Sequence, residues 1–359
     1  MNFGPSEEQI MLAESVASFA TRAFPLDRIR AFAESDERHA SDLWQALAEL
    51  GVAGMVIPES YGGVGLGVFD AALVAEALAY RVACVPFIGS AVLAPMALLW
   101  AGDEAQQKQW LPRLAAGEKV LGMALSEFAA GAREDAGLSV RDGRLYGKTL
   151  FVLEHAADAW IVAVGRDQLA LVTVDVPGLI CTHLPTVDRT RRVGELSFDG
   201  VAVQWLPHAT GETLRRLMDL ARVMLAADTL GAAQSMLDKA VAYAGERVQF
   251  GRPIGSFQAV KHMCAEMAAH LEPCRSMVWY AAHAQEHLPD EAFLLACHTK
   301  AHLAEVGNFV AKNAVEVHGG MGFTELSGLH YWFKRIGANR QLLGNPARCR
   351  AQAAEQELT

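Results

Sequence analysis

GERVQFGRPIGSFQAVKH, residues 245–262, is the densest signal in the sequence. It ends one long helical pattern and opens the next. It also interleaves three cations and a carboxamide with two aromatic rings: Arg247, Arg252, Lys261, Gln258, Phe250 and Phe257. A solvated turn between two helices is one interpretation. The other is a clamp for a ligand, because arginine and carboxamide groups beside aromatic rings suit a pyrophosphate and a purine.

A second motif, VEVHGGMGFTE at residues 315–325, ends the following helical pattern in a glycine-rich turn. Glycines at such a turn let the backbone approach a ligand or another chain closely. A helix C-cap followed by a tight turn explains the same pattern without a ligand. Neither motif alone decides between a structural and a binding role.

The rest of the chain divides into three regions. Residues 1–118 show helical spacing, and Ser6 to Gln9 fit a capping box. Residues 119–208 contain short strand-like runs separated by Gly, Asp and Pro, which predicts a compact β domain. Residues 209–359 return to long helical segments, expected at about 211–250, 256–287, 290–317 and 325–342. The sequence therefore predicts a mainly α protein with a central β domain and a C-terminal four-helix bundle.

Composition excludes several classes of protein. A formal charge of −10 and a pI near 5.7 argue against nucleic acid as the main partner. No uninterrupted apolar run approaches the roughly 20 residues of a membrane span, and the N-terminal residues lack the basic start of an export signal. The six cysteines are scattered, as in reduced cytoplasmic proteins. We expect a cytoplasmic protein.

Two motif matches are weak. HAQEH at residues 283–287 has the H-x-x-E-H spacing of a zinc site, but Pro289 follows almost at once and no third ligand is evident. The glycines of YGGVGLG, residues 61–67, lack the G-x-G-x-x-G spacing and any βαβ context. We expect neither a metal site nor a dinucleotide loop of that kind.

One basic stretch is unexplained at this point. KRIGANRQLLGNPARCR, residues 334–350, holds five Lys or Arg residues and no carboxylate in an acidic protein, and Gly344, Asn345 and Pro346 interrupt its helical pattern. Basic residues suit the last turn of a helix. The helical pattern ends at Gly344, Asn345 and Pro346, and the charges of the stretch do not explain this interruption.

The motifs at 245–262 and 315–325, in this order, resemble those of the flavin-dependent acyl-CoA dehydrogenase family. Four further stretches carry the resemblance: IPESYGGVGLG at 57–67, ALSEFAAGA at 124–132, GKTLFVLEHAADAWIVAV at 147–164 and DLAR at 219–222. The resemblance implies a helical N-terminal domain (1–118), a β-barrel-like middle domain (119–208) and a C-terminal bundle (209–359). It also implies FAD, an acyl-CoA substrate, assembly into tetramers and electron transfer to an electron-transferring flavoprotein.

In this family a glutamate removes a proton from the α carbon of the thioester while hydride leaves the β carbon for the flavin. Counting on from His318 to the usual place of that glutamate reaches Leu343, with Gly344 and Asn345 after it. In other members the base lies on the helix that precedes the first motif, and counting back from Arg247 reaches Ala221. Neither position holds an acid, so no catalytic base is evident.

Two neighbours of Ala221 match residues that contact acyl-CoA or orient the base in the family. These are Asp219 and Arg222, which we expect to bind substrate. Two residues along a helix turn through about 200°, so Asp219 points away from the direction of Ala221.

The resemblance also divides the flavin contacts into two sets. Residues that a family subunit offers to its neighbour's FAD are largely kept: Arg247, Phe250, Gln258, Gly319 and Gly320, with Glu316 where glutamine is frequent. Residues that hold the subunit's own FAD are eroded. Ser126 stands for a threonine, Phe151 for a tryptophan, Leu153 for a threonine, and Gly131 and Ala132 for a Gly-Ser pair. Losing these hydroxyl and indole groups weakens flavin binding in this subunit.

Three functions fit these observations. The first is the base-lacking subunit of a heterotetrameric acyl-CoA dehydrogenase of lipid or steroid catabolism, which completes the FAD site of a base-bearing partner. The second is an active homo-oligomer with a displaced base, for which Asp219 and Glu325 are the available carboxylates. The third is a non-enzymatic acyl-CoA-binding or scaffolding protein. The chain length and identity of the acyl group do not follow from the sequence.

Overall fold

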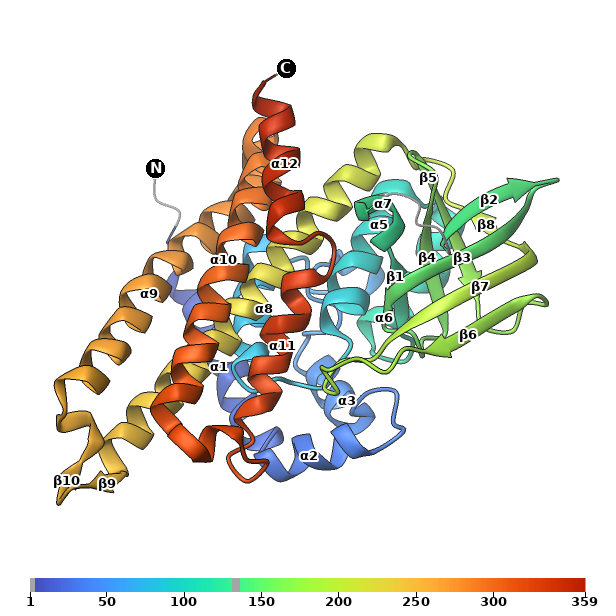
Figure 1. Ribbon diagram of the computed structural model, residues 1–359. Coiled ribbons are helices and arrows are strands. Elements are labelled where there is room, and N and C mark those ends of the chain that lie inside the picture. Colours follow the sequence, from blue (N-terminus) through green and yellow to red (C-terminus); the bar gives the residue numbers. More distant parts are fainter. Residues whose placement is uncertain (1–3, 131–135, 359) are drawn as a thin grey trace.

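The computed structural model describes residues 4–130 and 136–358. Helices from both ends of the chain form one body, and the strands form a sheet on one side of it (Figure 1). The expected domain boundaries, after residues 118 and 208, fall between helical and strand-rich segments. The division into three domains stays a prediction.

The N-terminal region is helical. It contains α1 (Glu7–Ala23), α2 (Leu26–Glu34), α3 (Ser41–Glu49), η1 (Glu59–Tyr61), α4 (Val68–Ala79), η2 (Phe87–Leu93), α5 (Ala94–Ala101) and α6 (Glu104–Ala115). The capping box predicted at Ser6 and Gln9 forms in both directions at the start of α1. The apolar run over η2 and α5 is largely buried. Within the described residues, no helix is both long enough and apolar enough to cross a membrane.

Most strands of the middle region join one sheet. They are β1 (Leu121–Ala124), β2 (Gly137–Arg141), β3 (Arg144–Leu153), β4 (Ala159–Val164), β5 (Gln168–Thr173), β6 (Leu179–His183), β7 (Val193–Ala202) and β8 (Gln204–Trp205), and the short helix α7 (Ser126–Ala130) follows β1. The strand order is β6-β7-β3-β1-β4-β5-β8, with β2 paired to β3. β1 and β4 are parallel, and the other pairs are antiparallel. The central strand β1 packs against η2 and α5 of the helical body.

The C-terminal region is a bundle of long helices. It contains α8 (Gly211–Glu246), β9 (Val248–Gln249), β10 (Arg252–Pro253), η3 (Ile254–Ser256), α9 (Gln258–His287), α10 (Pro289–His318), η4 (Gly319–Phe323), α11 (Leu329–Gln341) and α12 (Pro346–Glu357). The four expected helices are thus confirmed as α8 to α11, with shifts of a few residues at their ends. Helix α12 was not predicted from the sequence.

Helix α8 is the centre of this body because it packs against α4, α9, α10 and α11. Residues 217–233 of this helix are buried, and most of them are apolar or small. At Gly231 the backbones come so close that an added Cβ would lie 2.0 Å from the carbonyl oxygen of Glu76 on α4. Glycine at this position is therefore a condition of the α4–α8 contact.

The interruption in the basic stretch is the junction of α11 and α12. Helix α11 ends at Gln341, and Gly344 adopts a positive φ of 108°. The Asn345 side chain accepts a hydrogen bond from the Arg348 amide at 2.9 Å, and Pro346 is the first residue of α12. An N-cap asparagine and a proline at the first helical position are a typical helix start. The loop 342–345 is thereby turned toward the β domain.

Candidate functional site

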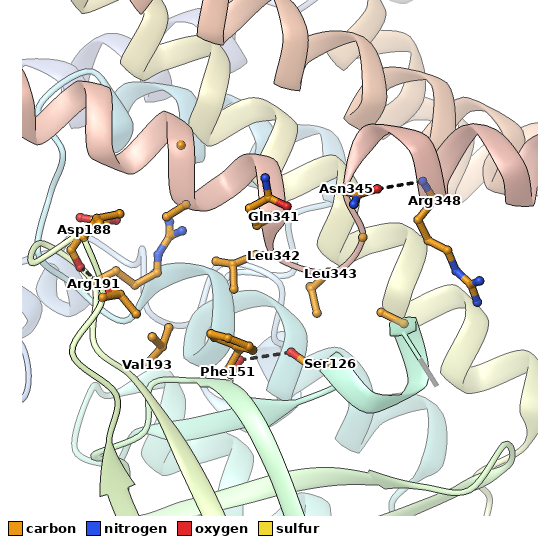
Figure 2. Close-up of a pocket in the computed structure, with 16 residues that line it drawn as sticks. Ser126, Phe151, Asp188, Arg191, Val193, Gln341, Leu342, Leu343, Asn345 and Arg348 are labelled. Carbon is orange, nitrogen blue, oxygen red and sulfur yellow. Dashed lines mark hydrogen bonds between the residues drawn. The ribbon is translucent and has the colours of Figure 1, made fainter. Parts of the chain in front are cut away.

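A cavity of about 610 Å³ lies between the β domain and the α11–α12 loop. Figure 2 shows Phe151 and Ser126 on one side of it and Gln341, Leu342 and Leu343 on the other. The structure thus brings together three residues that are separated in sequence, Ser126, Phe151 and Leu343, as the family resemblance implies. A cavity of this size accommodates a drug-sized ligand.

Leu343, the residue that the resemblance matches to the missing glutamate, faces this cavity. Its backbone is left-handed, with φ 56°, and its side chain is 4% exposed. Arg222 donates from Nε to the Leu343 carbonyl oxygen at 3.3 Å, and Lys300 donates from Nζ to the carbonyl oxygens of Asn339 and Gly344 at 2.6 and 3.4 Å. Two buried cations therefore fix the loop in a conformation that costs a leucine energy.

No lining residue of this cavity, among those that the structure describes, offers a free carboxylate. Asp188 is the acidic residue in its wall. One Asp188 oxygen accepts from the Thr190 amide and hydroxyl, and the other accepts from Arg335 Nε at 2.8 Å. The absence of a base at Leu343 is thus not repaired by a neighbour within the cavity.

An adjoining pocket of about 770 Å³ shares Ala129 and Arg348 with the cavity and is lined by Asp219 and Arg222. Asp219 Oδ1 is buried without a hydrogen-bond partner among the described residues, and it lies 3.8 Å from Arg222 Nη1. Burial raises the pKa of Asp219 to about 7, against the opposing charge of Arg222. Ala221, in contrast, is buried in the core of α8 and lines neither space.

The residues expected to serve a neighbour's flavin lie elsewhere. Arg247, Phe250, Gln258, Glu316, Gly319 and Gly320 occupy the end of α8, the β9–β10 hairpin, the start of α9 and the α10–η4 turn, and all six are exposed. In Figure 1 this hairpin lies at the opposite end of the bundle from the β domain. The structure therefore separates the two flavin sets in one chain.

Exposed aromatic and aliphatic groups mark this end of the bundle. Phe250 is 92% exposed, Phe323 83% and Leu326 71%. Phe250 has a positive φ of 53° and meets Phe257 edge to face, with ring centroids 6.1 Å apart. Arg252 covers the other aromatic ring, Phe257, at 4.2 Å. Large apolar side chains in water are typical of a surface that another molecule covers.

The remaining expected residues have other surroundings. Glu325 is exposed on the loop before α11, where its carbonyl accepts from Arg30, and it lines neither the cavity nor the adjoining pocket. Gly131 and Ala132 lie outside the described residues. Glu286 of the HAQEH motif accepts from the Val68 amide at 3.0 Å and so caps α4.

Sequence reasoning missed a buried charge network behind the cavity. Arg335 donates to Asp188 and to Asp228, and Arg191 donates to Asp228 and Asn339. The carboxylates that pair with Arg335 of the basic stretch thus come from the β domain and from α8. The run of charges in DRTRR, residues 188–192, was the available signal.

Comparisons with known proteins agree with this geometry. Residues 6–118 match the model of the acyl-CoA dehydrogenase N-terminal domain, and residues 212–358 match that of the C-terminal domain. Acyl-CoA dehydrogenase IpdE2 of Mycolicibacterium smegmatis is 32% identical over 95% of this chain and 96% of its own. Acyl-CoA dehydrogenase FadE27 of Mycobacterium tuberculosis is 32% identical over 83% of both chains.

Two solved structures show the same fold. A chain of the ChsE4-ChsE5 complex from Mycobacterium tuberculosis superposes with a TM-score of 0.92 at 28% identity, covering 100% of both chains. A chain of the Tcur3481-Tcur3483 steroid ACAD, in its G363A variant, gives 0.89 at 30% identity over 97% of both. With the helical N- and C-terminal regions, the central sheet and the cavity between them, the chain belongs to the acyl-CoA dehydrogenase family of oxidoreductases.

Proposed function

We propose that this chain is the base-lacking subunit of a hetero-oligomeric acyl-CoA dehydrogenase and completes the FAD site of a related, base-bearing partner. One observation carries the proposal. Leu343 presents an apolar side chain to the cavity from a backbone that Arg222 and Lys300 hold in place. Proton removal from a thioester α carbon needs a group that can accept the proton there.

The residues present are better suited to contact an FAD that the partner chain holds than to hold an FAD in this chain's own cavity. Ser126 donates its hydroxyl hydrogen to the Phe151 carbonyl oxygen at 3.3 Å, and Leu153 adds only an apolar side chain. Arg247, Phe250 and Gln258 are exposed on one surface, free to meet a cofactor that another chain carries. FAD supplies the acceptor for the hydride that leaves the β carbon.

In this proposal each residue set has a distinct task. Arg247, Gln258 and the Gly319–Gly320 turn bind the phosphate and adenine parts of the partner's FAD. The negative charge of Glu316 repels the phosphates and so weakens this binding. The chain's own cavity accepts an acyl-CoA with its acyl group beside Phe151 and its polar part beside Asp219 and Arg222. Without a base this ligand binds but does not react.

The comparisons support a two-chain assembly and a bulky substrate. Both structural relatives are named for a pair of different chains, ChsE4-ChsE5 and Tcur3481-Tcur3483, and the second is named a steroid ACAD. We propose a steroid-derived or similarly bulky acyl-CoA as the substrate of the assembly, an electron-transferring flavoprotein as its electron acceptor and the cytoplasm as its location. The cavity volume of about 610 Å³ is compatible with such a group.

One observation favours a second function. Asp219 has an unpartnered oxygen and a pKa raised to about 7, which suits a general base at neutral pH. An active homo-oligomer would then use Asp219 in place of the glutamate. Asp219 lines the adjoining pocket rather than the cavity that Phe151 and Leu343 enclose, so we rank this function second.

The experiment is to purify the chain alone and together with a related chain that has a glutamate at the position of Leu343. We expect FAD absorbance, and its bleaching by acyl-CoA, only in the co-purified assembly, at half occupancy per subunit. A yellow protein that acyl-CoA bleaches when this chain is alone would overturn the proposal. Asp219→Asn in that active protein would then decide whether Asp219 is the base.

A further inference from the structure

Arg191 is a buried cation at one end of the cavity that no part of the proposed reaction uses. It lies in the segment between β6 and β7 and lines the cavity but not the adjoining pocket. In Figure 2 it lies on the opposite side of Phe151 from Ser126 and Arg348. Arg348 and Ala129 are the residues that the cavity shares with the adjoining pocket of Asp219 and Arg222. Arg191 therefore marks the end of the cavity that is remote from the adjoining pocket.

The hydrogen bonds of Arg191 are incomplete within the described residues. Nη1 donates to Asn339 Oδ1 at 2.6 Å and Nη2 to Asp228 Oδ2 at 3.0 Å, while the side chain is only 9% exposed. A guanidinium has five N–H groups, so three remain for a ligand. No Arg191 nitrogen is both fully buried and unpartnered among the described residues, and a ligand oxygen in the cavity can accept from the remaining N–H groups.

Open space accompanies these donors. Gly337 and Gln341 line the cavity from α11, and Gly337 lies one helical turn further from the Leu343 loop. A Cβ added at Gly337 would meet no atom within 4 Å. The remote end therefore has room for atoms of a ligand as well as donors to bind them.

The charges around Arg191 indicate which kind of oxygen fits. Arg191 and Arg335 face Asp188 and Asp228, so the ion pairs are already balanced. The carboxyl of Glu154 borders the same network, and burial raises its pKa to about 7. A further full negative charge would face three acidic groups, whereas an uncharged carbonyl oxygen adds an acceptor without adding charge.

We propose that Arg191 is a specificity-determining residue, which donates to an uncharged carbonyl oxygen carried by the acyl group at its end remote from the thioester. The inference rests on the part of the proposed function in which this cavity receives an acyl-CoA. It adds a substrate class to that proposal: acyl-CoA thioesters with a distal keto group.

The test measures dissociation constants by titration calorimetry on the co-purified assembly. Each keto-acyl-CoA is paired with the unsubstituted acyl-CoA of equal length, for example 7-oxo-octanoyl-CoA with octanoyl-CoA, and further pairs extend to longer and ring-containing acyl groups. We expect the keto member of at least one pair to bind about tenfold more tightly, as one hydrogen bond to a charged donor provides. Equal affinities in every pair, or no binding at all, would overturn the inference.

Two variants assign the preference to this end of the cavity. Arg191→Met keeps similar length without N–H groups, so we expect it to abolish the keto preference and leave the affinity for unsubstituted acyl-CoA unchanged. Arg191→Met also removes the ion pair with Asp228, so a second variant is needed. Gly337→Leu fills the open space at the remote end and leaves Arg191, Arg335, Asp188 and Asp228 unchanged. It should weaken binding of the preferred keto ligand at least tenfold while the melting temperature is kept.

The outcomes separate this inference from the proposed function. A keto preference that survives both variants would refute the role of Arg191, as would a loss of FAD in Arg191→Met with the preference intact, which would assign the guanidinium to the flavin. The proposed function is judged by FAD content and bleaching, and these do not depend on the ratio of the two dissociation constants.

Discussion

Arg222 on α8 donates a hydrogen bond from Nε to the carbonyl oxygen of Leu343, 3.3 Å away, across 121 residues of sequence. In the proposed function Arg222 binds substrate and Leu343 occupies the position of the base. The hydrogen bond would then hold in place a loop that lacks the reacting group. This relationship makes the role of the position testable by a single substitution.

Leu343→Glu should restore a base on an existing scaffold. The backbone is already left-handed and the side chain already faces the cavity. We expect exchange of acyl-CoA α protons, followed by NMR in deuterated buffer, to be on the order of 10²-fold faster than in the matched variant Leu343→Gln. Equal exchange in the two variants would show that the loop does not present a side chain to the α carbon.

Arg247 and Phe151 separate flavin binding in trans from binding in cis. In the co-purified assembly, Arg247→Gln should lower the FAD content severalfold because it removes a cation from the partner's FAD. Phe151→Ala should change the FAD content little, since in the proposed function this chain's own cavity does not hold FAD. The measurement is FAD absorbance per mole of assembly. The reverse pattern would place the cofactor in this chain's cavity.

Asp219 should make stability fall as pH rises. Its folded pKa, about 7, is above the ordinary value of an aspartate because of burial, so the folded state binds the proton more tightly. The folded protein therefore loses stability relative to the unfolded chain as pH rises from about 4 to 7, by about 4 kcal/mol at most. Asp219→Asn should remove this slope in urea unfolding, whereas Asp167→Asn on the exposed β4–β5 turn should keep it.

Two arginines of the basic stretch offer a matched pair for stability. Arg335 is buried between Asp188 and Asp228, whereas Arg350 pairs with Glu305 at the surface. Arg335→Met should cost about 3–5 kcal/mol because it leaves buried carboxylates without their partner. Arg350→Met should cost less than about 1 kcal/mol. Similar costs in urea unfolding would contradict the assignment of Arg335 to a buried network.

Two helical glycines should respond in opposite directions to the same change. Gly231→Ala brings a Cβ onto the Glu76 carbonyl and should destabilise the protein by about 1–3 kcal/mol. Gly337→Ala meets nothing and replaces the weaker helix former, so it should stabilise by about 0.5–1 kcal/mol. Melting temperatures that shift in the same direction would show that the α4–α8 spacing is not set by Gly231.

Local patterns predicted much of the fold. Apolar residues at helical spacing located α8 to α11 to within a few residues, because an amphipathic or buried helix repeats its contacts every turn. The short helices at the ends of the chain gave less signal. Helix α12 was missed, since its polar composition on most faces leaves little periodicity to detect.

The sequence indicated individual residues of the candidate site but not how they are arranged in space. The motifs indicated Ser126, Phe151 and Leu343 separately, and only the fold shows that they enclose one cavity. Arg191 escaped notice because an arginine in a charged run is ordinarily solvated. Its burial depends on Asp228 and Asn339, which are 37 and 148 residues away.

By itself the sequence determined the family and the helical and strand-rich regions, and it predicted a missing carboxylate at Leu343, because these depend on residue type and spacing along the chain. The tertiary structure alone decided that the two sets of predicted flavin contacts lie at opposite ends of the bundle, and that Arg335 of the basic stretch pairs with Asp188 and Asp228. The physical reason is that burial and electrostatic pairing depend on distances in space, which local sequence periodicity does not contain.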